Sequence, residues 1–245
     1  MPVPDPPSLA STLVIRETPP ASGSIRDAPV SVAQAAEADL ARSVALLRAV
    51  AAGTTAQRRV VRLSVPPPTV AMSRRESRMP GFGEASEAAV GHGFVPVVRP
   101  TGGRAVAYDE TCVVFDVIVR EDEGAGDQAR FFREIGARLV GAMRALGVDA
   151  RLGEVPGEYC PGEYSVNARG VAKLIGTSQR AVRGARLLSG MVPLGPVDRF
   201  AAVLTEVNAA LGLDWDPATF GSLAHENPGL SRRTVADALV VALAE

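Results

Sequence analysis

The spacing of apolar residues along the chain predicts a mixed succession of helices and strands. Between residues 31 and 52, apolar side chains recur every three or four positions, which predicts an amphipathic helix with Ser31 as its N-cap. Residues 127–146 show the same periodicity along one face. The last part of the chain, residues 197–245, is also helical in pattern and divides into segments at 197–211, 217–225 and 231–244.

Shorter apolar stretches, some of them alternating with polar residues, predict strands. Residues 112–119 are almost entirely apolar and are expected to form a central strand. Arg169 and Gly170 join two other such stretches and are typical of a tight hairpin. Because strands and helices interleave without strict alternation, we expect an α+β fold with one mixed, largely antiparallel sheet flanked by helices. The remaining strands are expected at 61–65, 70–73, 94–99, 104–108, 148–152, 164–168, 171–175 and 187–194, and a short helix at 84–91.

The division of the chain into parts follows from composition. Residues 1–30 are rich in proline, serine and alanine and have little periodicity, so they are interpreted as a flexible N-terminal arm. Residues 31–245 are enough for one domain with a sizeable core. We therefore expect a single domain over 31–245 that ends in the helical segment 197–245.

Bulk charge and composition exclude several classes of function. The net charge of -1 and a pI of about 6.2 argue against binding to nucleic acid or to an anionic membrane surface. No apolar run approaches the roughly 20 residues that span a bilayer, and residues 1–24 lack the pattern of a secretory signal, so a cytoplasmic location is expected. The two cysteines, Cys112 and Cys160, are then expected to be free thiols, and neither has the Cys/His spacing of a zinc site.

The choice of basic residues is unusual. Of the 26 basic side chains, 25 are arginines and one is a lysine, Lys173. An ammonium is a compact point charge whose protonation responds to its surroundings, and a guanidinium does not share that property. The count alone leaves two interpretations of Lys173 open, a chemical role and chance survival.

A first candidate site is the loop that contains Gly102 and Gly103. These glycines lie between two predicted strands and are flanked by Arg99, Thr101 and Arg104. Paired glycines let the backbone turn sharply and present N–H groups to a bound carbonyl or phosphate. The same tripeptide is also an ordinary turn, and its spacing differs from that of the common nucleotide-binding fingerprints.

A second candidate site surrounds Cys160. The Pro161-Gly162 turn that follows is stiff and can keep the sulfur accessible, as a thiolate nucleophile requires. If the predicted hairpin forms, Lys173 returns toward this turn, where an ammonium favours the thiolate and stabilises an oxyanion. The alternative from these residues alone is a buried structural cysteine.

The order of these motifs resembles the biotin/lipoate protein ligase superfamily over about residues 30–212. Within it, the chain looks like the octanoyl-[glycine-cleavage H protein] amidotransferases. Residues 159–164 (YCPGEY) resemble the segment that bears their catalytic cysteine, and Lys173 with 176–180 (GTSQR) resembles their lysine-bearing strand. Residues 75–80 and 102–109 are similar to two of their loops. The ATP-dependent ligases have an Arg-Asn-Asp stretch where this chain has Cys160-Pro161-Gly162.

This resemblance implies a biotin/lipoate-ligase-like catalytic domain and an octanoyl or lipoyl transferase. Cys160 would carry the acyl group as a thioester and Lys173 would polarise the carbonyl. It implies no metal and no cofactor. The expected partners are lipoyl-carrier proteins, namely the glycine-cleavage H protein and the E2 lipoyl domains of 2-oxoacid dehydrogenases, or acyl carrier protein, with neither nucleic acid nor membrane. The expected substrate-binding residues are Arg99, Thr101, Gly102, Gly103, Arg104, Ala105, Tyr164, Gly176 and Thr177.

Two alternatives remain open at the level of sequence. One is an ATP-dependent lipoate-protein ligase on the same fold, which would need ATP and Mg²⁺ and in which Cys160 would be incidental. The other is a non-catalytic module that binds a lipoyl carrier or a small acid. Both Cys160 and Lys173 are present, which favours the transferase over this last alternative.

Overall fold

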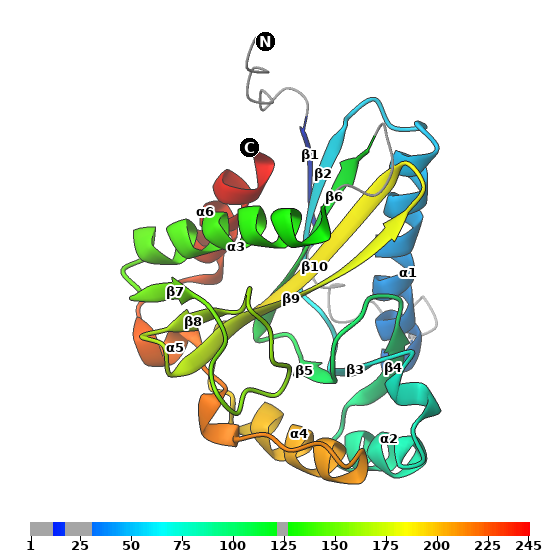
Figure 1. The fold of residues 1–245 in the computed structure, drawn as a ribbon, viewed down its shortest axis with the longest axis vertical. Helices are drawn as coiled ribbons and strands as arrows, with labels where there is room; N and C mark the ends of the chain where they lie inside the picture. Colours follow the sequence, from blue (N-terminus) through cyan, green and yellow to red (C-terminus); the bar gives the residue numbers. More distant parts are fainter. Residues whose placement is uncertain (1–11, 18–30, 122–126) are drawn as a thin grey trace, which may run out of the picture.

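A seven-stranded sheet forms the centre of the computed structural model, which describes residues 12–17, 31–121 and 127–245 (Figure 1). Its strand order is β1-β2-β6-β10-β9-β8-β7. The pair β1 and β2 is parallel, and the other neighbouring pairs are antiparallel. The expected α+β fold with a largely antiparallel sheet is thus confirmed. The strands are β1 Thr12–Arg16, β2 Arg59–Ser64, β6 Cys112–Arg120, β7 Ala150–Leu152, β8 Val166–Ala168, β9 Ala172–Val182 and β10 Ala185–Pro193.

Three further strands form a separate small sheet, so the prediction of one sheet is wrong. Its order is β4-β3-β5, with β3 parallel to β4 and antiparallel to β5. The four residues between β2 and β3 include three consecutive prolines, 66–68. Because proline lacks a backbone donor, the chain cannot continue the ladder there and leaves the large sheet. The strands are β3 Thr69–Ser73, β4 Val95–Arg99 and β5 Val106–Tyr108.

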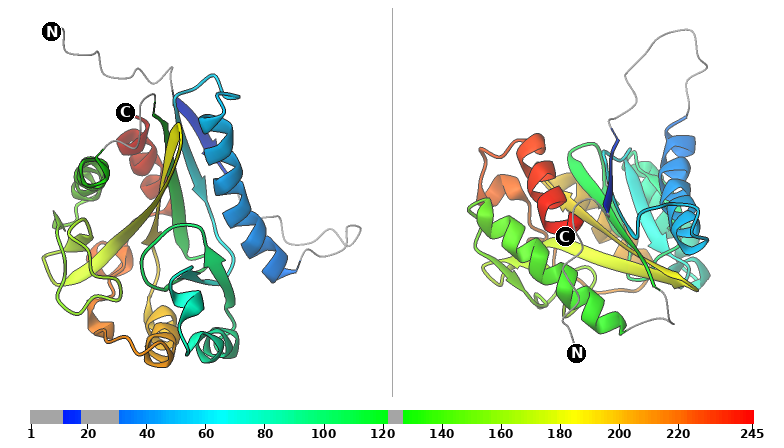
Figure 2. Two further views of the ribbon diagram at one scale, coloured as in Figure 1. Left: turned by 45° about the vertical axis from the view of Figure 1, so that its right-hand side comes forward. Right: turned by 90° about the horizontal axis from the view of Figure 1, so that it is seen from above.

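Helices cover both faces of the large sheet (Figure 2). Helix α1, Val32–Ala51, lies on one face, and α3, Gln128–Ala145, lies with α6, Arg232–Ala244, on the other. Helices α2, Phe82–Gly91, and α4, Asp198–Ala210, pack together against the small sheet. In the part of the chain that the structure describes, no helix has the length and apolar character needed to cross a bilayer. The short helices are η2 Glu76–Arg78, η3 Pro217–Thr219 and α5 Leu223–Glu226.

The helix starts follow the sequence signals. Ser31 and Gln34 form a capping box at the start of α1, in which each side chain accepts a hydrogen bond from the other residue's backbone N–H. Asp127 caps α3 and Ser231 caps α6 through their side-chain oxygens. The predicted caps at Ser31 and Ser231 are therefore confirmed.

The core has one layer on each face of the large sheet and one against the small sheet. Phe115 of β6 packs with α3 residues such as Leu139, whereas Ile118 of the same strand packs with Leu47 of α1. β6 is therefore buried on both faces, as its apolar sequence predicts. Each such side chain contributes about 1.5–3 kcal/mol by leaving water.

The expectation that residues 1–30 are a loose arm is wrong at β1. This strand pairs in parallel with β2, and its Leu13 and Ile15 pack against the cluster around Leu47. The Thr12 hydroxyl also donates to the carbonyl of Ala244, 2.7 Å away. Apolar contacts and a backbone ladder therefore fix this segment, although it is too short to show a clear periodicity. Residues 1–11 and 18–30 lie outside the described residues.

The predicted helix over 217–225 is replaced by two short turns of helix, η3 and α5. Between them, Phe220 forms a bridge with Lys173 of β9, and the Gly221 N–H donates to the Lys173 carbonyl at 2.9 Å. A Cβ on Gly221 would lie 3.0–3.2 Å from β9 atoms, so glycine leaves room for this close approach. Pairing with β9 therefore overrides the local helical pattern. The rest of the helical segment 197–245 agrees with the prediction.

Candidate active site

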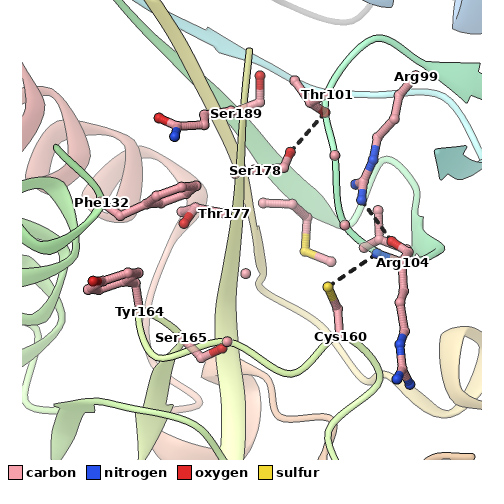
Figure 3. A pocket seen from close by; sticks show the side chains of 18 of the residues that line it. Arg99, Thr101, Arg104, Phe132, Cys160, Tyr164, Ser165, Thr177, Ser178 and Ser189 are labelled. Carbon is pink, nitrogen blue, oxygen red and sulfur yellow. Dashed lines mark hydrogen bonds between the residues drawn. The ribbon is translucent and has the colours of Figure 1, made fainter. Parts of the chain in front are cut away.

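One cavity of about 480 Å³ gathers almost all of the predicted site residues. It is bounded by the loop 99–104, the segment 159–165 and strands β6, β9 and β10 (Figure 3). Ala105 is the exception, because it is fully buried beside the cavity and its N–H donates to the Glu76 carboxylate at 2.7 Å. The predicted residues that line the cavity are Arg99, Thr101, Gly102, Gly103, Arg104, Cys160, Tyr164, Lys173, Gly176 and Thr177.

Cys160 lies half-buried in the cavity, on the segment of chain that connects β7 to β8. Its sulfur is directed at the loop 99–104 (Figure 3). The backbone N–H of Arg104 donates to Cys160 Sγ at 3.2 Å (Figure 3). Gly103 adopts φ +93°, and a Cβ there would lie 3.3 Å from Sγ and 2.8 Å from Arg99 Nη2. Glycine therefore lets the loop approach the sulfur closely. A backbone N–H is a donor of the kind that can stabilise negative charge on a nearby sulfur or oxygen atom.

The loop 99–104 is held in place from two sides. Arg99 Nη2 donates to the Arg104 carbonyl at 2.7 Å, which fixes the peptide next to the N–H that faces Cys160. On the other side, Ser178 of β9 donates to Thr101 Oγ1 at 2.9 Å (Figure 3). These two contacts fix the loop, so the Arg104 N–H is already in position beside the Cys160 sulfur.

Lys173 reaches the Cys160 segment, as expected, but its contact is with the main chain. Its side chain is 3% exposed, and Nζ donates to the Cys160 carbonyl at 2.6 Å and pairs with Glu158 Oε1 at 3.1 Å. The ammonium also lies 4.6 Å from the centre of the Tyr159 ring. A Cβ on Gly176 would lie 2.9 Å from Lys173 Cε, so glycine leaves room for this side chain. Lys173 therefore holds the backbone that carries the thiol.

Glu158 is the main site residue that the sequence prediction missed. It is buried and accepts hydrogen bonds from the Ser165 hydroxyl at 2.7 Å and the Val155 N–H at 3.2 Å, in addition to the pair with Lys173. A signal was present in the sequence, since a lysine placed inside a fold requires a carboxylate partner. Glu158 is two residues from the proposed nucleophile and is the natural candidate.

The aromatic residues of the segment have different roles. Burial raises the pKa of the Tyr159 hydroxyl, which therefore stays neutral, and its ring packs against Trp215 and Phe220. Tyr164 stacks on Phe132 of α3, with ring centres 5.6 Å apart and planes nearly parallel. In Figure 3 this stacked pair lies on the other side of β9 from Cys160. Tyr164 thus lines the cavity without contacting the thiol side.

The second cysteine and the histidines do not belong to this cavity. Cys112 is a free thiol, as expected, and it is fully buried; burial raises the pKa of this thiol to about 12, so it is unreactive at neutral pH. His92 pairs with Glu206 at the surface formed by α2 and α4. Over residues 12–17, 31–121 and 127–245, no group of three or more His, Cys, Asp or Glu side chains is placed to hold a metal ion.

Comparisons with known proteins agree with this arrangement. The model of the lipoyl protein ligase A/B catalytic domain matches residues 36–243. An octanoyl-[GcvH]:protein N-octanoyltransferase from Exiguobacterium sibiricum is 36% identical over 47% of this chain and 42% of its own length. A protein of the same name from Geobacillus kaustophilus is 32% identical over 57% of this chain and 48% of its own length, so the chain matches about half the length of these relatives.

A comparison with solved structures finds the same fold. A crystal structure of lipoate-protein ligase A bound with ATP superposes with a TM-score of 0.68 at 20% identity, covering 94% of this chain and 82% of that one. The resemblance inferred from the loop at 99–104, the Cys160 segment and the Lys173 strand is therefore confirmed at the level of family. The chain belongs to the lipoyl protein ligase A/B catalytic domain family.

Proposed function

We propose that this chain is an acyltransferase that moves an octanoyl or lipoyl group onto a lysine of a lipoyl-carrier protein through a thioester on Cys160. The observation that carries the proposal is the Arg104 N–H directed at Cys160 Sγ inside the cavity. The names of the relatives, octanoyl-[GcvH]:protein N-octanoyltransferases, support the acyl group and the class of acceptor.

The first half of the reaction transfers the acyl group to the enzyme. The Cys160 thiolate attacks the carbonyl carbon of a donor, either an acyl-lysine amide on one carrier or an acyl thioester on acyl carrier protein. A C–S bond forms, the bond from carbon to the donor's nitrogen or sulfur breaks, and the leaving group takes up a proton. The Arg104 N–H lies next to the reacting sulfur and stabilises the negative oxygen of the intermediate.

The second half returns the thiolate. The ε-amine of a lysine on the acceptor carrier attacks the thioester carbon, an amide forms, the C–S bond breaks, and the amine loses its proton to solvent. Lys173 keeps the Cys160 main chain in place during both halves, and Arg99 keeps the Arg104 peptide in place. Because the acyl group arrives already bonded to a carrier, the proposed reaction needs neither ATP nor a metal.

Intact-mass spectrometry tests the proposal directly. The protein is mixed with an octanoyl-carrier protein without ATP, beside Cys160→Ala and the matched variant Cys112→Ala. We expect an acyl adduct on the unmodified chain and on Cys112→Ala, and none on Cys160→Ala. The transferase proposal fails if no adduct appears and a carrier is modified only when ATP and free lipoate are supplied, since that result indicates the ligase reaction.

A further inference from the structure

Glu76, the first residue of η2, is a buried carboxylate that contacts the chain just after the loop 99–104. Only 3% of its surface is exposed. Its Oε1 accepts a hydrogen bond from the Ala105 N–H at 2.7 Å, and its Oε2 accepts from the N–H and the hydroxyl of Ser73 at 2.7 and 2.8 Å. All three donors are neutral groups. Burying a charge against neutral donors costs free energy, so its presence here indicates that the fold has a use for the charge.

The contact with Ala105 completes the support of one peptide group. The carbonyl of Arg104 accepts from Arg99 Nη2 at 2.7 Å (Figure 3). At the other end of the same peptide, the Ala105 N–H donates to Glu76 Oε1, also at 2.7 Å. The guanidinium thus meets the negative end of the peptide dipole and the carboxylate meets the positive end, and hydrogen bonds to charged groups are roughly twice as strong as neutral ones. The plane of this peptide is therefore fixed from both ends.

The fixed peptide adjoins the group that faces the sulfur. The Arg104 N–H, which donates to Cys160 Sγ at 3.2 Å, belongs to the preceding peptide. Because each peptide is planar, only the φ and ψ angles of Arg104 separate the two planes. A shift of the 104–105 plane is therefore passed to the N–H beside the sulfur. Glu76 thus acts on this donor through the main chain, without a contact to the thiol of its own.

The small sheet brings the supporting groups to one edge. Strands β3 and β4 are parallel and end in register at Ser73 and Arg99, and the antiparallel strand β5 begins directly after Ala105 (Figure 1). Glu76 follows the end of β3 after two residues. The carboxylate, the guanidinium and the peptide that they hold therefore come from three neighbouring strand ends. The small sheet supports the donor that faces Cys160.

We propose that Glu76 is a positioning residue for acyl transfer, whose carboxylate holds the Arg104–Ala105 peptide so that the Arg104 N–H is directed at the reacting centre. The inference rests on the proposed function and adds to it a residue that acts through the backbone. The alternative is a purely structural role, in which the carboxylate only ties η2 to Ser73.

The first test measures acylation of Cys160 by octanoyl-acyl carrier protein in a single turnover, over a range of donor concentrations. Glutamine has one acceptor oxygen and one NH₂ group, so in Glu76→Gln the NH₂ must face a backbone N–H of either Ala105 or Ser73. Deleting a donor to a negative oxygen costs about 10²–10³-fold in rate, and a displaced donor should cost less. We expect the maximal rate to fall at least about 10-fold, with an unchanged half-saturating donor concentration.

The matched control lies in the same short helix. Ser77→Ala removes a hydrogen bond from the Ser77 hydroxyl to the Arg74 carbonyl, 3.0 Å away, and leaves the contacts of Glu76 in place. It should acylate Cys160 at the rate of the unmodified chain.

Alkylation by iodoacetamide separates positioning from a general loss of structure. It joins the Cys160 sulfur to carbon with loss of iodide and develops no negative oxygen, whereas attack on an acyl carbonyl does. In Glu76→Gln we therefore expect alkylation to slow less than acylation, so that the ratio of the two rates falls. If this variant does not fold, Glu76→Asp is the second one: it keeps the carboxylate but is one methylene too short to bond both Ala105 and Ser73, and the ratio should fall again.

The outcomes separate the inference from the function on which it rests. An unchanged maximal rate in Glu76→Gln overturns the inference. An equal decrease of acylation and alkylation, or a rise of the half-saturating concentration alone, also overturns it, since either result indicates that the carboxylate only supports the fold. In these cases the unmodified chain still forms the acyl adduct. If it forms none, the proposed function fails and the inference fails with it.

Discussion

The buried pair of Lys173 and Glu158 makes a quantitative prediction about stability. Both side chains are almost completely shielded, with 3% and 0% of their surface exposed. Glu158→Gln keeps the shape but removes the charge, and the Lys173 ammonium is left with the Cys160 carbonyl and the Tyr159 ring. Removing one partner of such a pair costs about 3–5 kcal/mol. In a chain of this length each kcal/mol lowers Tm by about 2–4 °C, so we expect a decrease of roughly 6–20 °C.

Thermal unfolding followed by circular dichroism measures this loss. Lys173→Met should have a similar cost, because it leaves the Glu158 carboxylate uncompensated, and the double variant should be more stable than either single one. The matched control is Glu134→Gln, which breaks the pair with Arg138 on the surface of α3, where the Glu134 side chain is 42% exposed. Its expected cost is below about 1 kcal/mol.

The result that refutes this reasoning is equally specific. If Glu158→Gln is no more destabilising than Glu134→Gln, the ammonium does not depend on the buried carboxylate. If the double variant loses the sum of the two single losses, Lys173 and Glu158 do not interact. In either case Lys173 could not be held against the Cys160 main chain in the way that the distances indicate.

Three further predictions concern the site and its surroundings. Gly103→Ala should slow acylation of Cys160 at least about 10-fold, because a Cβ at φ +93° displaces the loop; an unchanged rate of adduct formation contradicts this. At about pH 8 a thiol reagent should label Cys160 alone in the folded protein and both thiols in urea, since a pKa of about 12 leaves about one in ten thousand Cys112 thiols ionised; rapid labelling of Cys112 in the fold contradicts this. Burial raises the pKa of Glu17, but the arginines around it, chiefly Arg62, outweigh burial and lower this pKa below the usual 4.5. The ionised Glu17 carboxylate therefore stabilises the folded protein at neutral pH, and this contribution is lost as pH falls through the lowered pKa. Urea unfolding of Glu17→Gln should therefore show a loss of stability at pH 7 that disappears at about pH 2, and an equal loss at both values contradicts the assignment.

Local signals in the sequence predicted most of the fold. The apolar run of β6, the periodicity of α3 and the caps at Ser31 and Ser231 are properties of neighbouring residues, and each corresponds to an element of the structure. The failures come from distant contacts. β1 is fixed by β2 and by Ala244, and η3 and α5 are separated by pairing with β9. No local pattern contains that information.

The site was predictable to a similar extent. Cys160, Lys173 and the glycine loop could be located because short motifs and a hairpin signal mark them, and the structure places all three around one cavity. Glu158 was missed, because its contact with Lys173 depends on which segments become neighbours, although a buried lysine implies that some carboxylate lies nearby. Ala105 was included through its sequence neighbours, but its side chain lies in the core just before β5.

The scarcity of lysine has a chemical consequence if Cys160 carries the proposed thioester. Such a thioester acylates any accessible primary amine, and an ordinary surface offers many lysine side chains as unintended acceptors within its own chain. Here the 245-residue sequence offers one, and its ammonium is enclosed by a carboxylate, a carbonyl and an aromatic ring. The arginines that replace lysine elsewhere stay protonated and are poor nucleophiles. The chain is therefore protected against self-acylation at its side chains, and amine-reactive labels should leave the side chains of the folded protein unmodified.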